Sequence, residues 1–319
     1  MLSRVADCLY WMSRYLERAE HTLRLLDVNM GLMLDHSSLS VDSRWERVLH
    51  ALGKPEEVAW DGDLYKLVYT LTLDGNVDAS VRSCIVGARE NARRVREQIS
   101  TEQWQRLNRM FHNVTMPRNP TNAESYMPDF IASVLDGIHL FQGVTDTTMS
   151  HGEGWQFIQV GRYIERASAT ASLIEVYNHD LQMSGPVEEH SEYLELVGLL
   201  RSCTAFEAYC KVYTADLSYD RILDFIVLDA EFPHSLRYSV DRLQEGLEAI
   251  YRDSGRQPAD DLMRLTGRVK SSLSYIQISE MLEDDAGVYL RTIVRQCREI
   301  QDLIYQRYIH YSVQTALAD

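Results

Sequence analysis

The 319-residue sequence contains few cysteines and no long apolar run. Its five cysteines are scattered, and no two of them form the Cys-x-x-Cys pair that is typical of zinc sites and dithiol redox centres. Unpaired, scattered cysteines favour a reducing compartment, so we expect a cytoplasmic protein. Charged residues interrupt every apolar stretch, including the one at the N-terminus, so the sequence predicts neither a signal peptide nor a membrane-spanning helix.

Positive charge and glycine-rich phosphate loops are also scarce. The 32 Lys and Arg residues against 47 Asp and Glu residues give a formal net charge of −15, which repels nucleic-acid phosphates and anionic lipid surfaces. We therefore expect neither a nucleic acid nor a membrane as a partner. The 16 glycines are dispersed, and the sequence has no Walker loop, Rossmann fingerprint or Gly-x-Ser-x-Gly motif. No nucleotide site and no cofactor is predicted for this chain.

Apolar residues recur at alternating spacings of three and four through most of the chain, which is the period of an amphipathic helix. The first such stripe extends from Leu2 to Met33 with no proline, and it predicts one continuous helix of roughly 50 Å. Similar stripes cover residues 81–99 and 236–250. The predicted fold is therefore all-α, a bundle of long helices.

Two segments depart from this helical pattern. Residues 113–128 contain three prolines and several Asn and Thr residues, so we expect a long loop there. Residues 222–229, ILDFIVLD, are apolar enough to be either strand or helix. By contrast, Ser100 and Gln103 match a capping box and predict the start of a helix.

A charged motif occurs twice, as SRYLERAEHT at residues 13–22 and as GRYIERASAT at residues 161–170. A shift of 148 positions superimposes the two motifs together with the apolar stripes around them. A shift of 155 positions likewise superimposes residues 64–82 on residues 219–237. Two matched blocks in the same order predict an internal duplication of a unit of about 150 residues.

We therefore predict two helical repeats, residues 1–150 and residues 151–319, packed as one globular unit about a pseudo-twofold axis. The Arg and Glu residues of the motif lie on the helix face opposite the apolar stripe. In the two copies they are Arg14, Glu17, Arg18, Arg162, Glu165 and Arg166.

Three interpretations of these residues are open. The first is a solvated helix face with local ion pairs such as Arg14 with Glu17. The second places them between the two halves, where each glutamate holds the opposing helix through bidentate arginine contacts. The third is a polar site at the pseudo-twofold axis, with Glu17 and Glu165 as candidate catalytic groups and the arginines as ligand-binding groups.

A metal site at Glu17, Glu20 and His21 is a further hypothesis that the second copy argues against. Ferritin-like di-metal bundles require Glu-x-x-His on two helices together with a glutamate from each of two others. The second copy has Ser168 and Ala169 where the first has Glu20 and His21. We therefore predict no metal, and we expect His21 to be solvated or close to a helix end.

Four arginines form a basic ridge beside the apolar stripe of residues 81–99. Such a ridge can receive a carboxylate, a phosphate or an acidic partner surface. The alternative is a solvated face that pairs locally with Glu90 and Glu97. The ridge residues are Arg82, Arg89, Arg93 and Arg96, and the first three are candidate ligand-binding residues.

The two motifs, together with ARENARRVREQIS and GEGWQFIQVGRYIERA, resemble the alpha-E family, which is named for its helical character and its Glu-Arg motif. The similarity extends nearly from end to end. It implies an all-helical protein found beside circularly permuted ATP-grasp enzymes, transglutaminase-like peptidases and, in some settings, a proteasome-like peptidase. ATP-grasp relatives activate a carboxylate as an acyl phosphate and pass it to an amine, so this company implies chemistry on peptide-type amide bonds.

The resemblance thus implies a helical partner subunit of an ATP-grasp-type amide or peptide ligase system. Such a subunit would bind the ligase or a peptide-like substrate, with a transglutaminase-like protein as a further partner. Two alternatives are an enzyme with its own acid-base or amide-transfer site at a Glu17/Glu165 pocket, and a scaffold protein without catalytic activity. They differ in whether the two motifs converge on a common solvent-reachable cavity.

Overall fold

The computed structural model describes residues 1–33, 39–53, 58–183, 189–214, 216–254, 260–283 and 285–309. Over these ranges the chain forms fourteen α-helices and four short 3-10 or π segments, and it contains no strand. The predicted all-α class is confirmed. None of the helices in these ranges is long and apolar enough to cross a lipid bilayer.

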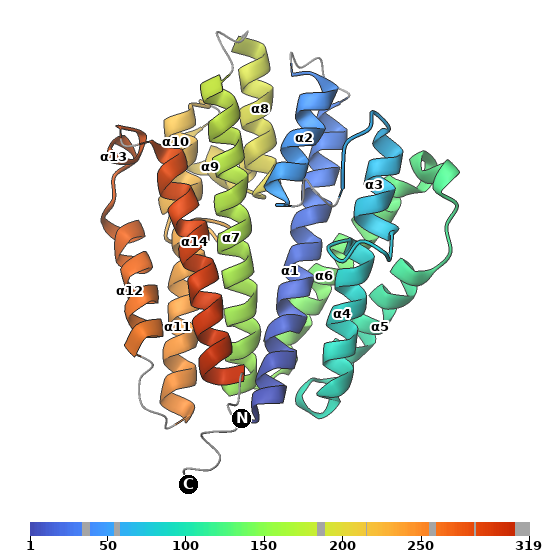
Figure 1. Ribbon diagram of the computed structural model, residues 1–319, viewed down its shortest axis with the longest axis vertical. Helices are drawn as coiled ribbons and strands as arrows, with labels where there is room; N and C mark the ends of the chain where they lie inside the picture. The colour runs from blue at the N-terminus through green and yellow to red at the C-terminus, as the bar shows by residue number, and fades with distance from the viewer. Residues whose placement is uncertain are drawn as a thin grey trace.

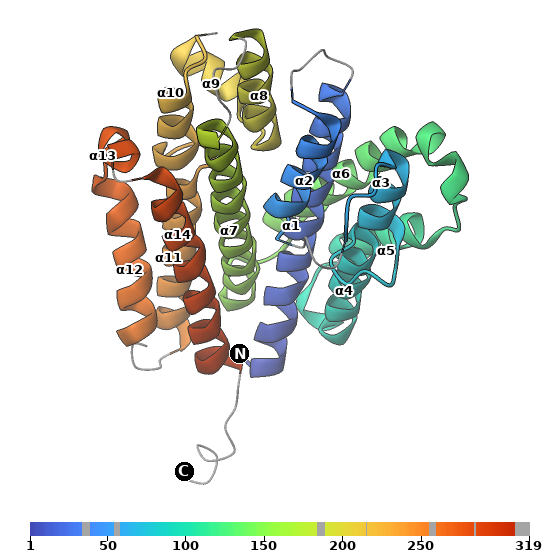
Figure 2. The same ribbon diagram turned by 45° about the horizontal axis from the view of Figure 1, so that its top comes forward.

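Two long helices lie side by side at the centre of the molecule, α1 (Ser3–Leu32) and α7 (Glu153–Met183) (Figure 1). Helices α2 to α6 lie on the α1 side, and helices α8 to α14 lie on the α7 side, in both views (Figure 1, Figure 2). The other α-helices are α2 (Val41–Ala51), α3 (Leu64–Leu73), α4 (Val81–Arg94), α5 (Thr101–Thr115), α6 (Ala123–Thr148), α8 (Glu189–Ser202), α9 (Phe206–Tyr213), α10 (Tyr219–Leu223), α11 (Leu236–Ser254), α12 (Asp260–Tyr275), α13 (Ile278–Glu283) and α14 (Ala286–Ile304). The short segments are η1 (Arg96–Gln98), η2 (Pro120–Asn122), η3 (Asp224–Leu228) and η4 (Tyr305–Ile309).

Helix α1 has the length that its uninterrupted apolar stripe predicts, 30 residues. Leu9, Leu16 and Leu23 on this stripe are buried. The polar face is buried as well, because α1 packs against α7 as well as against α4 and α6. Arg14 and Glu17 are only 6% and 4% exposed. The solvated-face interpretation of the first motif is therefore wrong. The polar face is buried because α1 has neighbouring helices on both sides.

The predicted long loop at residues 113–128 is also wrong. Helix α5 extends to Thr115, and α6 already begins at Ala123, so only Met116–Asn119 lie outside helical segments. Pro128 is the sixth residue of α6, where its missing N–H removes one hydrogen bond close to the helix start.

The two other local predictions are resolved by the structure. The ambiguous segment ILDFIVLD is helical, as the end of α10 and the π segment η3. The capping box is confirmed, since the Gln103 backbone N–H donates to Ser100 Oγ and the Ser100 N–H donates to Gln103 Oε1. The internal duplication and the repeat boundary near residue 150 stay predictions.

Helices α1 and α7 approach each other closely at Gly161. A Cβ atom built on Gly161 would lie 2.3 Å from Ser13 Oγ and 2.4 Å from the Tyr10 carbonyl oxygen. Ser13 is itself fixed, because its hydroxyl donates to that same carbonyl over 2.9 Å. Gly161 and Ser13 occupy the same position in the two motifs. The absence of a side chain at Gly161 thus permits the two motifs to come within hydrogen-bonding distance.

We expect Gly161→Ala to lower the free energy of unfolding by about 2 kcal/mol, because overpacking of a tight contact forces backbone or side chains to move. Urea denaturation followed by circular dichroism measures this change. Gly143→Ala in α6 is the matched control, since nothing lies within 4 Å of a Cβ atom built there. It should be neutral or stabilise the protein by up to about 1 kcal/mol. Equal effects of the two substitutions would contradict the close approach.

Candidate functional site

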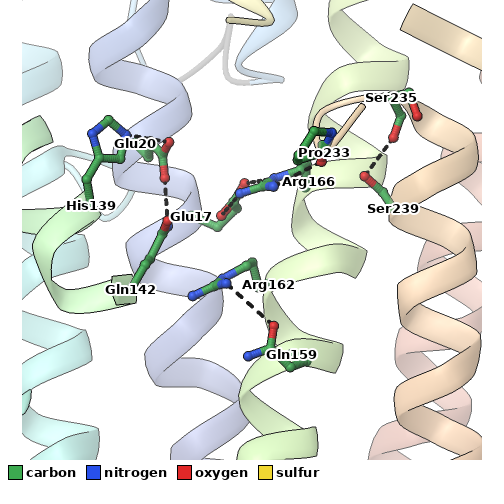
Figure 3. Close-up of polar contacts among 10 residues, drawn as sticks. All are labelled: Glu17, Glu20, His139, Gln142, Gln159, Arg162, Arg166, Pro233, Ser235 and Ser239. Carbon is green, nitrogen blue, oxygen red and sulfur yellow. Dashed lines mark hydrogen bonds and ion pairs between the residues drawn. The ribbon is translucent and has the colours of Figure 1, made fainter. Parts of the chain in front are cut away.

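The two charged motifs meet between α1 and α7, and each glutamate binds arginines of the opposite motif. Glu165 accepts hydrogen bonds from Nε of Arg14 and Nε of Arg18, both over 2.7 Å. Glu17 accepts hydrogen bonds from Nε and Nη2 of Arg166, over 2.5 and 3.0 Å (Figure 3). These contacts form the geometry of the second interpretation, a buried bidentate link between the two helices. We call Arg14, Glu17, Arg18, Arg162, Glu165 and Arg166 the Glu-Arg centre.

The exchange of partners is not symmetric. Arg14 binds Glu165 and also stacks on the Trp11 ring, 4.5 Å from its centroid. Its counterpart Arg162 instead contacts Gln159 on its own helix over 3.5 Å, and it forms no ion pair with a described residue (Figure 3). Glu165 therefore has two arginine partners, whereas Glu17 has one.

This difference gives the two glutamates different acidities. Burial raises the pKa of Glu17, and the charge of Arg166 offsets that effect only in part. Burial acts on Glu165 in the same direction, but the charges of Arg14 and Arg18 outweigh it and hold its pKa below the usual value. Glu165 is thus held as a carboxylate, and Glu17 is the member of the centre that takes up a proton more readily.

Glu20 extends the polar network from Glu17 towards α6. It accepts a hydrogen bond from Gln142 Nε2 over 2.9 Å, and it lies 3.1 Å from His139 Nε2 (Figure 3). Burial acts to raise the pKa of Glu20, but the hydrogen bond from His139 and the charge of Arg166 lower it overall. The same hydrogen bond raises the pKa of His139. Glu20 therefore carries a negative charge next to the more easily protonated Glu17.

Two cavities flank the centre and share His21 in their walls. The Glu17 cavity has a volume of about 20 Å³, room for about one water molecule. The Glu165 cavity has a volume of about 380 Å³, which is within the size range of small-molecule sites. The Glu17 cavity is lined by Glu17, Glu20, His21, Arg166, Cys203 and His234, among others. The Glu165 cavity is lined by Arg14, Arg18, His21, Glu165, Ser168 and Arg298, among others.

The expectation that His21 is solvated is wrong. The packing of α7 against α1 places its side chain in the wall that the two cavities share. Its Nε2 atom is buried and has no hydrogen-bond partner among the described residues. Burial lowers the pKa of His21 to about 4, so the imidazole is neutral at neutral pH. No group of three or more His, Cys, Asp and Glu side chains in the described part of the chain is arranged to hold a metal ion.

Cys203 also lines the Glu17 cavity, where a thiol is a potential nucleophile. Burial raises its pKa to about 12, and the thiolate is the nucleophilic form. Cys203 is therefore an unreactive part of the wall.

The predicted basic ridge lies on α4 and, for Arg96, on η1, and none of its arginines lines either cavity. Arg82 donates to the Leu73 carbonyl, and Arg93 donates to Glu90 over 2.9 Å. Arg89 donates to Asn108 over 2.8 Å and stacks on the Phe111 ring. These local contacts match the alternative of a locally paired face. Ligand binding by Arg82, Arg89 and Arg93 stays a prediction.

A second buried ion-pair cluster joins the two sides of the molecule. The sequence patterns did not predict it. Arg44 of α2 donates to Glu195 of α8 over 2.6 Å, and Arg47 binds the same carboxylate. Arg47 also stacks on the Tyr177 ring, 4.1 Å from its centroid. Arg44, Arg47 and Glu195 belong to no repeated motif, so the sequence contains no signal that pairs them. The same holds for His234 and Arg298, since only the packing brings them to the cavities.

These features define an all-helical protein built around two Glu-Arg motifs that bind each other. A family model described as a predicted alpha-helical domain with a conserved ER motif matches residues 1–309. The chain belongs to this family, alpha-E.

The chain is also similar to uncharacterized mycobacterial proteins. One is from Mycobacterium bovis and two are from Mycobacterium tuberculosis, and each is 26% identical over 272 residues. The matched region covers 79% of this chain but only 30% of each relative, so the chain spans about a third of the length of these curated relatives. No solved structure matches the chain significantly.

We expect the two equivalent glutamates to differ in their contribution to stability. Glu165→Gln removes the carboxylate shared by Arg14 and Arg18, and breaking a buried ion pair from one side costs about 3–5 kcal/mol. Glu17→Gln should cost less, about 1–3 kcal/mol, because burial already disfavours the charged form of Glu17 and Arg166 keeps its hydrogen bond to the Pro233 carbonyl. Urea denaturation of both variants at pH 7 measures the difference. An equal or larger loss for Glu17→Gln would show that the acidities are assigned the wrong way round.

The same assignment predicts opposite pH dependences. The pKa of Glu165 is lowered on folding, so its contribution to stability is present above the pKa of a free glutamate, about 4.3, and is lost as the pH falls further. The pKa of Glu17 is raised on folding, so its contribution is present below about 4.3 and is lost as the pH rises through the folded-state pKa.

The measurement is the free energy of unfolding of the wild type minus that of each Gln variant, from pH 7 to pH 3. This difference should shrink towards low pH for Glu165→Gln and grow towards low pH for Glu17→Gln. Parallel curves for the two variants would contradict the prediction.

Proposed function

We propose that this chain is a helical subunit of an ATP-grasp-type amide or peptide ligase system. In this role it binds the peptide-like substrate, while a partner protein supplies the nucleotide site and the bond-forming chemistry, with a transglutaminase-like protein as a further partner. The main support is the Glu165 cavity, which lies in the seam between α1 and α7 next to the family's Glu-Arg motif. Its volume of about 380 Å³ is suited to one or two residues of a peptide.

The walls of this cavity support substrate binding better than catalysis. Both oxygens of Glu165 accept hydrogen bonds from arginines, and its pKa is lowered, so it is a weak base. The other polar groups on the wall are guanidinium, hydroxyl and amide groups together with a neutral imidazole. Such groups orient a polar ligand through hydrogen bonds.

The length of the relatives also supports a subunit role. In the mycobacterial proteins a region similar to this chain makes up 30% of a longer polypeptide. Joining two modules in one chain raises the effective concentration of each for the other. A unit that forms part of a longer polypeptide in its relatives is therefore a good candidate to work beside a second functional unit.

An enzyme with its own acid-base chemistry is the second candidate. It is favoured by Glu17, whose pKa is raised by burial, and by the presence of His21 and His234 around the same cavity. The volume of that cavity, about 20 Å³, leaves room for a water molecule but not for a peptide. A scaffold without catalytic activity is the third candidate, since the ion pairs of the centre also stabilise the helix packing.

Reconstitution of the ligase system with and without this chain tests the proposal. We expect ligation to require the chain, and Arg18→Met to raise the KM for the peptide about tenfold, the effect of losing one charged hydrogen bond. Arg264→Met on α12 is the control, because it removes an exposed guanidinium outside both cavities.

Ligation that proceeds unchanged without the chain, together with a lack of co-purification, would reject the subunit role. Glu17→Gln separates the other candidates. A folded variant with full turnover excludes acid-base chemistry at Glu17, whereas a loss of turnover with unchanged peptide KM would favour the enzyme. Variants that change only the melting temperature would favour the scaffold.

A further inference from the structure

We infer that the Glu165 cavity binds the carboxylate group of a peptide-like ligand between Arg18 and Arg298. This inference rests on the proposed function and adds to it the chemical group that is recognised and the two side chains that recognise it.

Arg18 is held in place by one nitrogen and leaves two others available. Its Nε donates to Glu165 Oε1 over 2.7 Å, while Nη1 and Nη2 have no hydrogen-bond partner among the described residues. The side chain is 32% exposed and lines the cavity. A guanidinium fork matches the two oxygens of a carboxylate. Glu165 thus holds Arg18 by its Nε and leaves the Nη1–Nη2 edge unpaired on a side chain that lines the cavity.

Arg298 provides a second cation from another helix. It lies on α14, lines the same cavity and forms no ion pair or hydrogen bond with any residue that the structure describes. Arg295, one turn earlier on α14, instead approaches Glu299 at 3.9 Å. Arg298 therefore adds to the cavity wall a positive charge that no described carboxylate neutralises.

The charges on the wall favour an anion. Arg14, Arg18 and Arg298 contribute three positive charges, Glu165 contributes one negative charge, and the neutral His21 adds none. The wall thus carries an excess of two positive charges. The side chains of Arg14 and Arg18 are 7% and 32% exposed, and electrostatic attraction in such partly desolvated surroundings is stronger than in bulk water. A carboxylate on the far side of Arg18 from Glu165 is attracted by this excess.

The remainder of the cavity is suited to a peptide and not to a bare inorganic anion. Hydroxyl and amide groups of Thr22, Ser168, Ser172 and Gln301 can pair with peptide N–H and C=O groups. Val58 and Leu71 provide apolar wall for an aliphatic part of the ligand. His21 has a buried, unpartnered Nε2 in the same wall, and an unsatisfied buried nitrogen is costly unless a ligand or water pairs with it.

Isothermal titration calorimetry with the purified chain tests the inference at constant salt and pH 7. The probes are N-acetyl-glycyl-glycine, which ends in a carboxylate, its C-terminal amide, and inorganic phosphate. We expect the acid to bind and the amide and phosphate to bind at least about tenfold more weakly, because they lack the charge or the planar shape that fits a guanidinium fork.

Two variants and one control locate the site. Arg18→Met and Arg298→Met should each weaken binding of the acid about tenfold, the effect expected for one charged hydrogen bond. Arg295→Met on the same helix should leave it unchanged. Arg298 has no partner in the described structure, so its substitution does not threaten the fold even where Arg18→Met disturbs Glu165.

Absence of binding, equal binding of acid and amide, or phosphate binding as tight as that of the acid would overturn the inference. So would unchanged affinity in Arg298→Met. These failures are separate from failure of the proposed function. A ligase system that requires this chain while the purified chain binds no peptide acid would retain the subunit role and remove the carboxylate site.

Discussion

The exchange of buried Glu-Arg ion pairs between α1 and α7 is the interaction on which the structure depends. A buried charge without a partner is costly, so each glutamate must face the arginines of the opposite helix. Sliding or rotating one helix against the other would leave Glu17, Glu165 and the arginines unpaired in a low-dielectric interior. Together with the close contact at Gly161, this requirement sets the relative position of the two central helices.

The same interaction creates both the asymmetry of the centre and its two cavities. Two copies of one motif have different neighbours, because α1 packs against α4 and α6 whereas α7 packs against α11 and α14. Glu165 is consequently bound by two arginines beside a cavity of about 380 Å³, and Glu17 by one arginine beside a cavity of about 20 Å³. Nearly identical sequences thus form a carboxylate with two arginine partners beside a candidate ligand site, and a carboxylate with one arginine partner beside a cavity the size of a water molecule.

Features that depend on sequence neighbours were predictable. The extent of α1 follows from its apolar period, and the start of α5 follows from the capping box at Ser100. The Arg and Glu residues of the motif were recognised because they repeat. The loop prediction for residues 113–128 was wrong because Pro120 lies at the start of η2 and α6 accommodates Pro128 with the loss of one backbone hydrogen bond. The prediction for His21 was wrong because its exposure depends on which helix covers it.

The amino-acid sequence by itself determined that the chain is helical, since local spacing and capping involve residues within a few positions of one another. It also determined which charged residues recur with the same spacing. Only the tertiary structure decided that Glu17 binds Arg166 and Glu165 binds Arg14 and Arg18, and that Arg298 reaches the larger cavity. Those outcomes depend on contacts between residues more than 120 positions apart, which periodicity does not encode.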